Sequence, residues 1–132
     1  MIVVGFSATA PGRAALTAAV GEAILRRQPL LVLNSSRGDA YADPRYAQQA
    51  DWDWVKTTLD EAGVAFTVRQ ELRGRGPSEE ILDVVEEVGA TLCVIGIRKR
   101  TAVGKMLLGS NANRILMESP CPVLSVRAAE ED

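Results

Sequence analysis

Strand-like and helix-like segments alternate along the whole of this 132-residue chain, and this alternation constrains its fold more than any other feature. Short apolar runs predict strands at 2–6, 30–33, 64–72, 91–95 and 122–126. The run at 91–95 is apolar on both faces, which is typical of a central strand in a parallel sheet. Alternation of this kind predicts an α/β fold, in which right-handed crossovers place helices on both faces of a parallel sheet.

Four helices are expected between these strands, at 11–26, 44–62, 77–88 and 111–117. Three of them carry proline in the first turn, where its missing N–H removes no helical hydrogen bond. Glycine or proline closely follows the end of each helix, as expected of a helix stop.

The composition suits one globular domain. Hydrophobic residues make up 47% of the chain and charged residues 24%, which is ordinary usage for a folded protein. We expect a single domain over 1–127 and a short acidic tail over 128–132. The net charge of −2 argues against nucleic acid as a general partner, and no apolar run approaches the ~20 residues of a membrane span. The first expected strand begins without a basic leader, so no signal peptide is expected.

The chain has no histidine, which removes the usual activator of serine and cysteine nucleophiles and the commonest metal ligand. Its two cysteines, Cys93 and Cys121, form no CxxC pair, so we expect a reducing cytoplasm and no structural metal. Cys93 is expected in the core. Cys121 stands between two prolines and is a candidate for an exposed, redox-sensitive thiol, although no activating cation is near it in sequence.

The carboxyl ends of the strands are the expected binding edge, because ligands of parallel α/β sheets bind there, where the strand order reverses. The loops after Phe6, Leu33 and Ile95 lie at this edge. The last of them, residues 96–111, holds glycines and cations between a strand and a helix. Free backbone N–H groups and the positive end of the helix dipole both favour an anion at such a place, so the loop is predicted to hold phosphate.

The cations of this loop are Arg98, Lys99, Arg100 and Lys105. They lack interleaved aromatic residues, so they indicate a phosphate-facing or solvated loop and not a nucleic-acid surface. The Gly-Lys pair that ends at Lys105 is not a Walker A motif. Lys99 stands where that motif needs its first glycine, and Met106 stands where it needs serine or threonine.

These residues resemble the universal stress protein family, and the resemblance covers nearly the whole chain up to the C-terminal Pro-Cys-Pro-Val-Leu segment. Nucleotide-binding members carry Gly, two residues, Gly, nine residues, Gly, and then Ser or Thr. Gly96, Gly109 and Ser110 match this motif, while Lys99 replaces its second glycine. The resemblance implies an open five-stranded parallel sheet of strand order 3-2-1-4-5 that binds an adenine nucleotide.

A second departure follows the first strand, where similar nucleotide-binding proteins usually have an aspartate that reaches the adenine. Ser7 occupies this position and lacks the charge and the reach of aspartate. The lysine at 99 adds a phosphate contact, or its Cβ forbids a positive φ that glycine permits. The resemblance implies a base pocket of Phe6, Ser7 and Ser35, with Gly96, Arg98, Lys99, Gly109, Ser110 and Asn111 around the ribose and phosphates.

The function implied is that of a small cytoplasmic stress-response protein that binds ATP, together with Mg²⁺, as a sensor or regulator. No catalytic residue and no metal ligand of the chain are assigned, although slow ATP hydrolysis is compatible with this function. An alternative is an interaction module of the same fold without nucleotide, which Ser7 and Lys99 favour. An ATP-hydrolysing or adenylating enzyme is a further alternative, against which the lack of a second substrate domain argues.

The last expected strand also predicts an assembly. Similar proteins often pair this edge strand with its copy in a second subunit, and Val123, Leu124 and Val126 are free to form such a pair. A homodimer is therefore expected, with no nucleic acid or membrane partner.

Local interpretations compete with some of these assignments. Gly109 could simply allow a tight turn, and Ser110 could simply cap the following helix. Trp54 is expected to pack into the core and Trp52 to lie on the surface or at a subunit contact, although the pair could also form a stacking platform.

Overall fold

The computed structural model describes residues 1–35, 48–71, 76–98, 100–102, 105–107 and 109–128. These residues form strands and helices in regular alternation, with one short hairpin inserted before the last helix. In chain order they are β1 (Ile2–Gly5), α1 (Ala10–Arg26), β2 (Leu30–Ser35), α2 (Gln49–Ala62), β3 (Phe66–Glu71), α3 (Pro77–Val88), β4 (Leu92–Gly96), β5 (Arg100–Ala102), β6 (Lys105–Leu107), α4 (Ser110–Glu118) and β7 (Val123–Val126).

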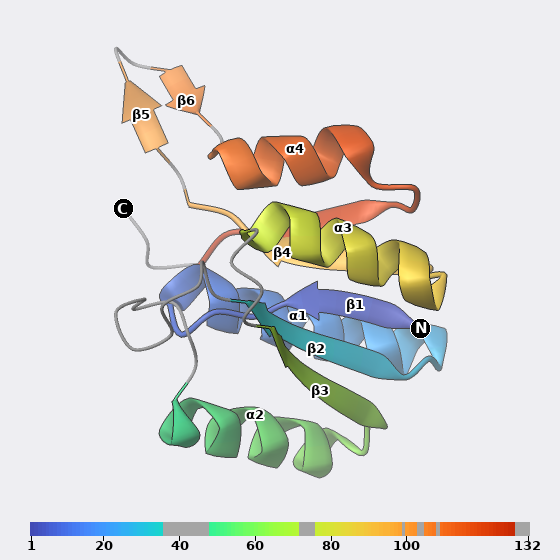
Figure 1. Cartoon of the computed structure of the whole chain (residues 1–132). Coiled ribbons are helices and arrows are strands. Elements are labelled where there is room, and N and C mark those ends of the chain that lie inside the picture. Colours follow the sequence, from blue (N-terminus) through green and yellow to red (C-terminus); the bar gives the residue numbers. More distant parts are fainter. Residues whose placement is uncertain (36–47, 72–75, 99, 103–104, 108, 129–132) are drawn as a thin grey trace.

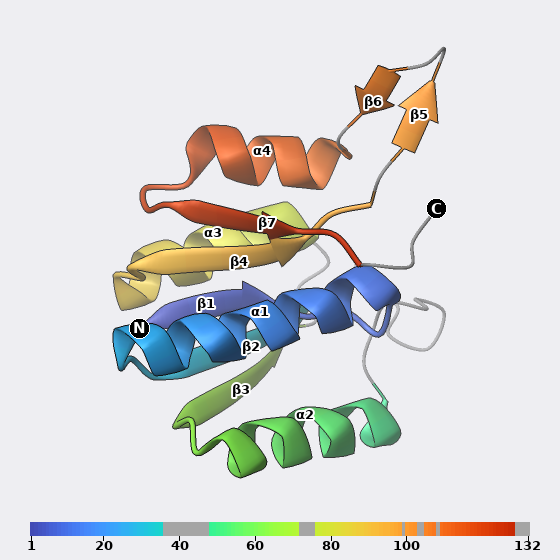
Figure 2. The same ribbon diagram turned by 180° about the vertical axis from the view of Figure 1, so that it is seen from behind.

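Five parallel strands form the central sheet in the order β3-β2-β1-β4-β7. This confirms the predicted α/β class and the strand order 3-2-1-4-5, with β7 as the fifth strand. Helices α3 and α4 lie against one face, and α1 and α2 lie against the other (Figures 1 and 2). The strand order reverses beside β1, so the carboxyl ends of β1 and β4 flank the point where ligands of this architecture bind.

Two apolar cores lie on opposite faces of the sheet. In β1, Ile2 and Val4 point into the core under α1 and α2, whereas Val3 points into the core under α3 and α4. All three side chains are fully buried, and β2 and β4 alternate in the same way. Burial on both faces explains why the central strands are near-continuous apolar runs.

The helix ends follow the predicted chemistry with one exception. Gly63 and Gly89 end α2 and α3 with φ values of 69° and 60°, a left-handed conformation that glycine adopts without a steric cost. Helix α1 ends in the same conformation at Arg27, with φ of 55°. Ile24, near this end of the helix, is an exposed apolar side chain.

The hairpin of β5 and β6 was not predicted. Its strands pair antiparallel, with Arg100 opposite Leu107, and stand apart from the main sheet beyond the carboxyl end of β4 (Figure 1). Helix α2 begins at Gln49, and its expected start at residue 44 lies outside the described residues. No helix of the described chain is both long and apolar enough to cross a bilayer.

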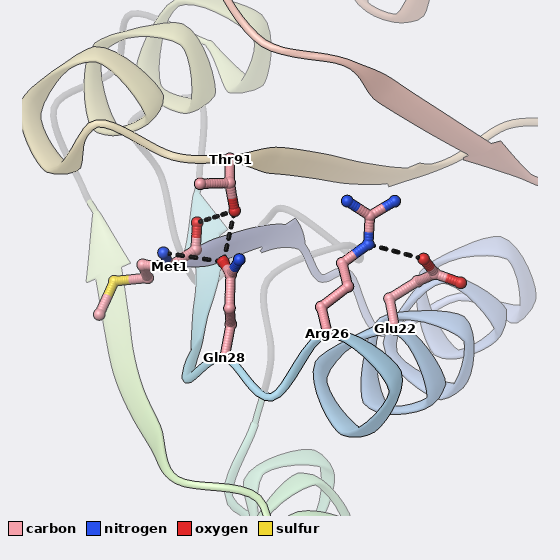
Figure 3. Close-up of polar contacts among 5 residues, drawn as sticks. All are labelled: Met1, Glu22, Arg26, Gln28 and Thr91. Carbon is pink, nitrogen blue, oxygen red and sulfur yellow. Dashed lines mark hydrogen bonds and ion pairs between the residues drawn. The ribbon is translucent and has the colours of Figure 1, made fainter.

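Polar contacts hold the opposite, amino-terminal edge of the sheet (Figure 3). The amino group of Met1 donates to Oε1 of Gln28 at 3.1 Å. Oγ1 of Thr91 hydrogen-bonds to the same Gln28 oxygen and donates to the Met1 carbonyl at 3.3 Å. Since Gln28 follows α1 and Thr91 precedes β4, these contacts join the starts of β1, β2 and β4.

Cys93 is buried in the core under α3 and α4, as predicted. Burial raises the pKa of its thiol from 9.0 to about 12, and the nearby Cys121 contributes to the same shift. Both cysteines are free thiols.

We expect the stability of the folded protein to fall as pH rises above about 9, because unfolding frees a Cys93 proton that the native state holds until about 12. In Cys93→Val this titration is gone. The free energy of unfolding of the variant, measured in urea at a series of pH values, should therefore decrease less steeply than that of the wild type. Parallel curves for the two proteins would contradict the assignment.

Candidate functional site

The loop from β1 to α1 folds tightly onto the first turn of α1. Thr9 caps this helix, and its Oγ1 accepts a hydrogen bond from the Gly12 N–H at 3.1 Å. The same oxygen is hydrogen-bonded to Oγ of Ser7 at 2.7 Å. A Cβ at position 12 would lie only 2.1 Å from the Ser7 carbonyl oxygen. The loop can therefore pack this closely against the helix only because residue 12 is glycine.

Gly96, at the carboxyl end of β4, meets the same turn of α1 from the other side. A Cβ at this position would lie 2.2 Å from the carbonyl oxygen of Pro11. The glycine therefore has a packing role, because it brings the end of β4 against α1. This role is independent of any ligand.

A cavity of about 160 Å³ opens between the carboxyl ends of β1 and β4 and the first turns of α3 and α4. It lies where the strand order reverses. Among the described residues that line it, most have apolar side chains and none is charged. The lining residues are Gly5, Phe6, Ser7, Leu33, Pro77, Ile81, Ile95, Gly96, Asn111, Ala112 and Ile115.

The N-terminus of α4 lies at the edge of this cavity and has no side-chain cap. Gly109 is its N-cap residue, with a φ of −66° that any residue can adopt. A Cβ at Gly109 would meet no atom of the described residues within 4 Å. Gly109 is not in the left-handed conformation, and Ser110 is the first residue of the helix and not its cap, so the expectation that Ser110 caps α4 was wrong. This end of α4 offers backbone N–H groups and the positive end of a helix dipole to an anion.

Four of the expected binding residues line the cavity, namely Phe6, Ser7, Gly96 and Asn111. Gly109 and Ser110 directly precede Asn111 at the start of α4. Arg98 is exposed two residues beyond β4. Ser35 ends β2, opposite Glu71 of β3, but its side chain and the whole of Lys99 lie outside the described residues. The structure thus brings most of the expected residues to one edge of the sheet.

Sequence reasoning missed Asn34, a fully buried carboxamide near the end of β2. Its Nδ2 donates to the Phe6 carbonyl at 2.8 Å, and its Oδ1 accepts from Nε2 of Gln70 at 3.2 Å. This contact fixes the backbone immediately before Ser7. The sequence did contain a clue to this residue, because Asn34 is polar and directly follows the apolar run 30–33, at the end of the strand where ligands are expected.

Three aromatic rings meet beside the same edge. The ring centroid of Phe6 lies 5.7 Å from that of Trp52 and 6.2 Å from that of Trp54. Trp52 packs against the core under α1 and α2, whereas Trp54 is 36% exposed. The expectation for the two tryptophans was therefore reversed, because the helix turns Trp52 toward Phe6 and the sheet and leaves Trp54 at the margin.

An ion-pair network joins the two helices that flank the cavity. Arg114 of α4 donates from Nη1 to Oε1 of Glu79 in α3 at 2.8 Å and from Nε to Oε2 of Glu118 at 3.0 Å. The hydrogen bond that Arg114 donates to Glu79, followed by the one that it donates to Glu118, raises the pKa of its guanidinium. Among the described residues, no group of three or more metal-ligating side chains gathers in one place.

An open parallel sheet whose strand order reverses at a cavity defines a doubly wound α/β protein. An uncapped helix N-terminus lies beside the cavity. Comparison with known proteins narrows this class. The chain belongs to the universal stress protein family, whose sequence model matches residues 1–127.

A universal stress protein of Mycolicibacterium smegmatis is 47% identical over 127 residues, which span 96% of this chain and 97% of that protein. The solved universal stress protein from Archaeoglobus fulgidus is 30% identical, with a TM-score of 0.71 over 94% of this chain and 96% of its own. A structure of the universal stress protein from Archaeoglobus fulgidus in complex with dAMP is 25% identical, with a TM-score of 0.64 over 94% of each chain.

Two glycine substitutions should separate packing from ligand binding. We expect Gly96→Ala to reduce the free energy of unfolding by about 1–3 kcal/mol, because its Cβ collides with the Pro11 carbonyl. Gly109→Ala meets open space and should change stability by no more than about 1 kcal/mol, the usual scale of an N-cap exchange. Urea denaturation measures both. An equal loss in the free energy of unfolding for both variants would contradict the difference in packing between Gly96 and Gly109.

Proposed function

We propose that this protein binds an adenine nucleotide at the cavity between β1 and β4 and acts as a regulator or sensor. The observation that carries the proposal is Gly109, whose absent side chain leaves open space beside the cavity at an uncapped helix N-terminus. Nothing in the described protein needs a glycine there for packing. A phosphate held by the first N–H groups of α4 explains why the position is kept free of a side chain.

The nucleotide we propose is ATP, accompanied by Mg²⁺. The spacing of Gly96, Gly109 and Ser110 matches the motif of nucleotide-binding family members, and the Archaeoglobus fulgidus relative binds dAMP. Arg98 stands near the same edge and supplies positive charge. Mg²⁺ would rest mainly on the phosphates of the nucleotide, as is usual for this ion.

A regulatory role fits the chemistry of the site better than fast catalysis. The chain has no histidine, and no carboxylate lines the described cavity. General-base activation of water needs such a group within hydrogen-bond reach. We place the protein in the cytoplasm, where its two free cysteines would stay reduced.

One observation favours the second candidate, an interaction module without nucleotide. The Ser7 hydroxyl is already hydrogen-bonded to Oγ1 of Thr9, the oxygen that caps α1. It is thus less available to a base than the aspartate that similar proteins carry. Binding measurements on the wild-type protein distinguish the two candidates.

The test of the nucleotide site is Gly109→Val. Its branched side chain would fill the space proposed for phosphate and remove at least one charge-assisted hydrogen bond, so the Kd for Mg-ATP should rise by about ten- to a hundredfold. Isothermal titration calorimetry measures the change. Gly21→Val is the matched control, because a Cβ at Gly21 of α1 also meets open space, far from the cavity. Unchanged affinity in the Gly109 variant would refute the assignment.

We also propose a homodimer formed through the open edge of β7. The carbonyl of Pro122 accepts a hydrogen bond from the N–H of Cys93 in β4 at 3.0 Å, and that of Val126 accepts one from the N–H of Ile97, just after β4, at 2.8 Å. Because alternate residues of a strand face opposite sides, the backbone groups of Val123 and Ser125 point to the open edge. Met117, near the end of the helix that precedes β7, is an apolar side chain that is 78% exposed.

Ser125→Pro should convert the dimer to a monomer in sedimentation velocity experiments, because proline removes an outward N–H without removing a hydrogen bond to β4. Ser125→Ala is the control and should remain dimeric. It should also be at least as stable as the wild type, since the buried Ser125 hydroxyl has no hydrogen-bond partner in the described structure. A wild type that sediments as a monomer would exclude the dimer, and a dimeric Ser125→Pro would exclude this edge.

A further inference from the structure

An open groove lies at the amino-terminal edge of the sheet, at the opposite end from the cavity of the candidate site. The carboxyl ends of α1 and α2 border it, together with the residues that lead into β2 and β3 (Figure 2). Its volume is about 530 Å³. Most of its lining residues have apolar side chains, among them Ile24, Pro29, Val64 and Ala65.

The wall of this groove presents apolar surface that the fold leaves uncovered. Ile24 is 57% exposed, and Pro29 and Ala65 are exposed as well. Leu25, which follows Ile24 but does not line the groove, is 77% exposed. Large apolar side chains that are exposed singly are ordinary on a protein surface. Two in succession beside an open groove indicate a contact surface.

The groove also offers one available positive charge. Arg27 is the charged residue among its described lining, and Gln28 is engaged in the contacts at the start of the sheet (Figure 3). The neighbouring Arg26 is paired with Glu22 at 3.0 Å. The Arg27 guanidinium forms no ion pair or hydrogen bond with any described residue. A carboxylate in the groove would therefore find a free cation.

The backbone of Arg27 adopts a conformation that suits glycine better. Its φ of 55° and ψ of 48° are left-handed, and among the described residues Arg27 is the one non-glycine residue with a positive φ. Gly63 ends α2 beside the same groove in this conformation without a steric cost. Arg26 in the last turn of α1 already complements the helix dipole. An arginine at position 27 thus indicates a role for its charge outside the fold.

We propose that this groove docks a partner protein through a segment that carries a large apolar side chain next to a carboxylate. The apolar side chain would pack on Ile24, and the carboxylate would pair with Arg27. A symmetric contact between two copies of this chain is disfavoured, because it would bring two Arg27 side chains together. The groove and the nucleotide cavity lie at opposite ends of the sheet, so the proposal does not depend on nucleotide binding.

Two short peptides of the same shape and different charge test the pairing. The probes are acetyl-Leu-Leu-Glu-amide and acetyl-Leu-Leu-Gln-amide, titrated to millimolar concentration into the isotope-labelled protein. We expect both to shift the backbone amide NMR signals of Ile24, Arg27 and Ala65. The glutamate peptide should bind about three- to fivefold more tightly, which is the scale of an exposed ion pair. Absence of shifts at the groove with both peptides would overturn the proposal, whatever the protein does with nucleotide.

Adjacent residues provide matched variants for the charge and for the apolar contact. Arg27→Gln should make the two peptides bind equally, whereas Arg26→Gln, outside the groove, should keep the difference. Ile24→Ala should weaken both peptides at least threefold because it removes buried apolar area, and Leu25→Ala should leave their binding unchanged. A preference for glutamate that persists in Arg27→Gln would contradict the pairing. Equal effects of the Ile24 and Leu25 variants would contradict the docking position.

Arg27→Gly gives a second readout that a purely structural role would not produce. Its Tm should rise by about 2–5 °C because glycine relieves the left-handed conformation, while the preference for the glutamate peptide disappears. A lower Tm would show that Arg27 serves the fold and would overturn the proposal. Sedimentation velocity addresses the other occupant. Loss of a wild-type oligomer in Ile24→Ala, but not in Leu25→Ala, would assign the groove to a second copy of this chain.

Discussion

The first turn of α1 is pressed against the carboxyl ends of β1 and β4, and the geometry of the binding edge depends on this contact. Two glycines permit it. At Gly12 the helix backbone touches the Ser7 carbonyl, and at Gly96 the end of β4 touches the Pro11 carbonyl. A side chain at either position would separate the loop, the helix and the strand that together form one side of the cavity. Close packing at this turn therefore sets the positions of Phe6 and Ser7.

The sheet could be predicted from the sequence because its strands are buried on both faces. Ile2, Val3 and Val4 all lie in the core, so the run needs no alternation to be recognised. The β5–β6 hairpin could not be predicted in this way, because it lies outside the central sheet and three-residue strands carry little periodic signal. The assignment of Trp52 and Trp54 was wrong for another reason, since helical spacing alone does not show which of two nearby rings packs against the core.

The parts of the candidate site that are formed by neighbouring residues in the sequence could be predicted. The loop length between Gly96 and Gly109 and the helix that follows are both visible in the sequence. Contacts between distant segments were not visible. The packing of Gly96 against Pro11 adds a structural role that the sequence does not show, and the hydrogen bond from Asn34 to the Phe6 carbonyl is equally hidden in the sequence.

The buried carboxamide of Asn34 has a consequence for the outermost strand of the sheet. Gln70 on β3, Asn34 on β2 and the Phe6 carbonyl after β1 form one continuous chain of hydrogen bonds across three strands. The open margin of β3 is thus mechanically connected to the loop that lines the cavity, two strands away. A displacement of β3 at Gln70 would therefore strain the hydrogen bonds that hold the Phe6 carbonyl, next to the loop that lines the cavity.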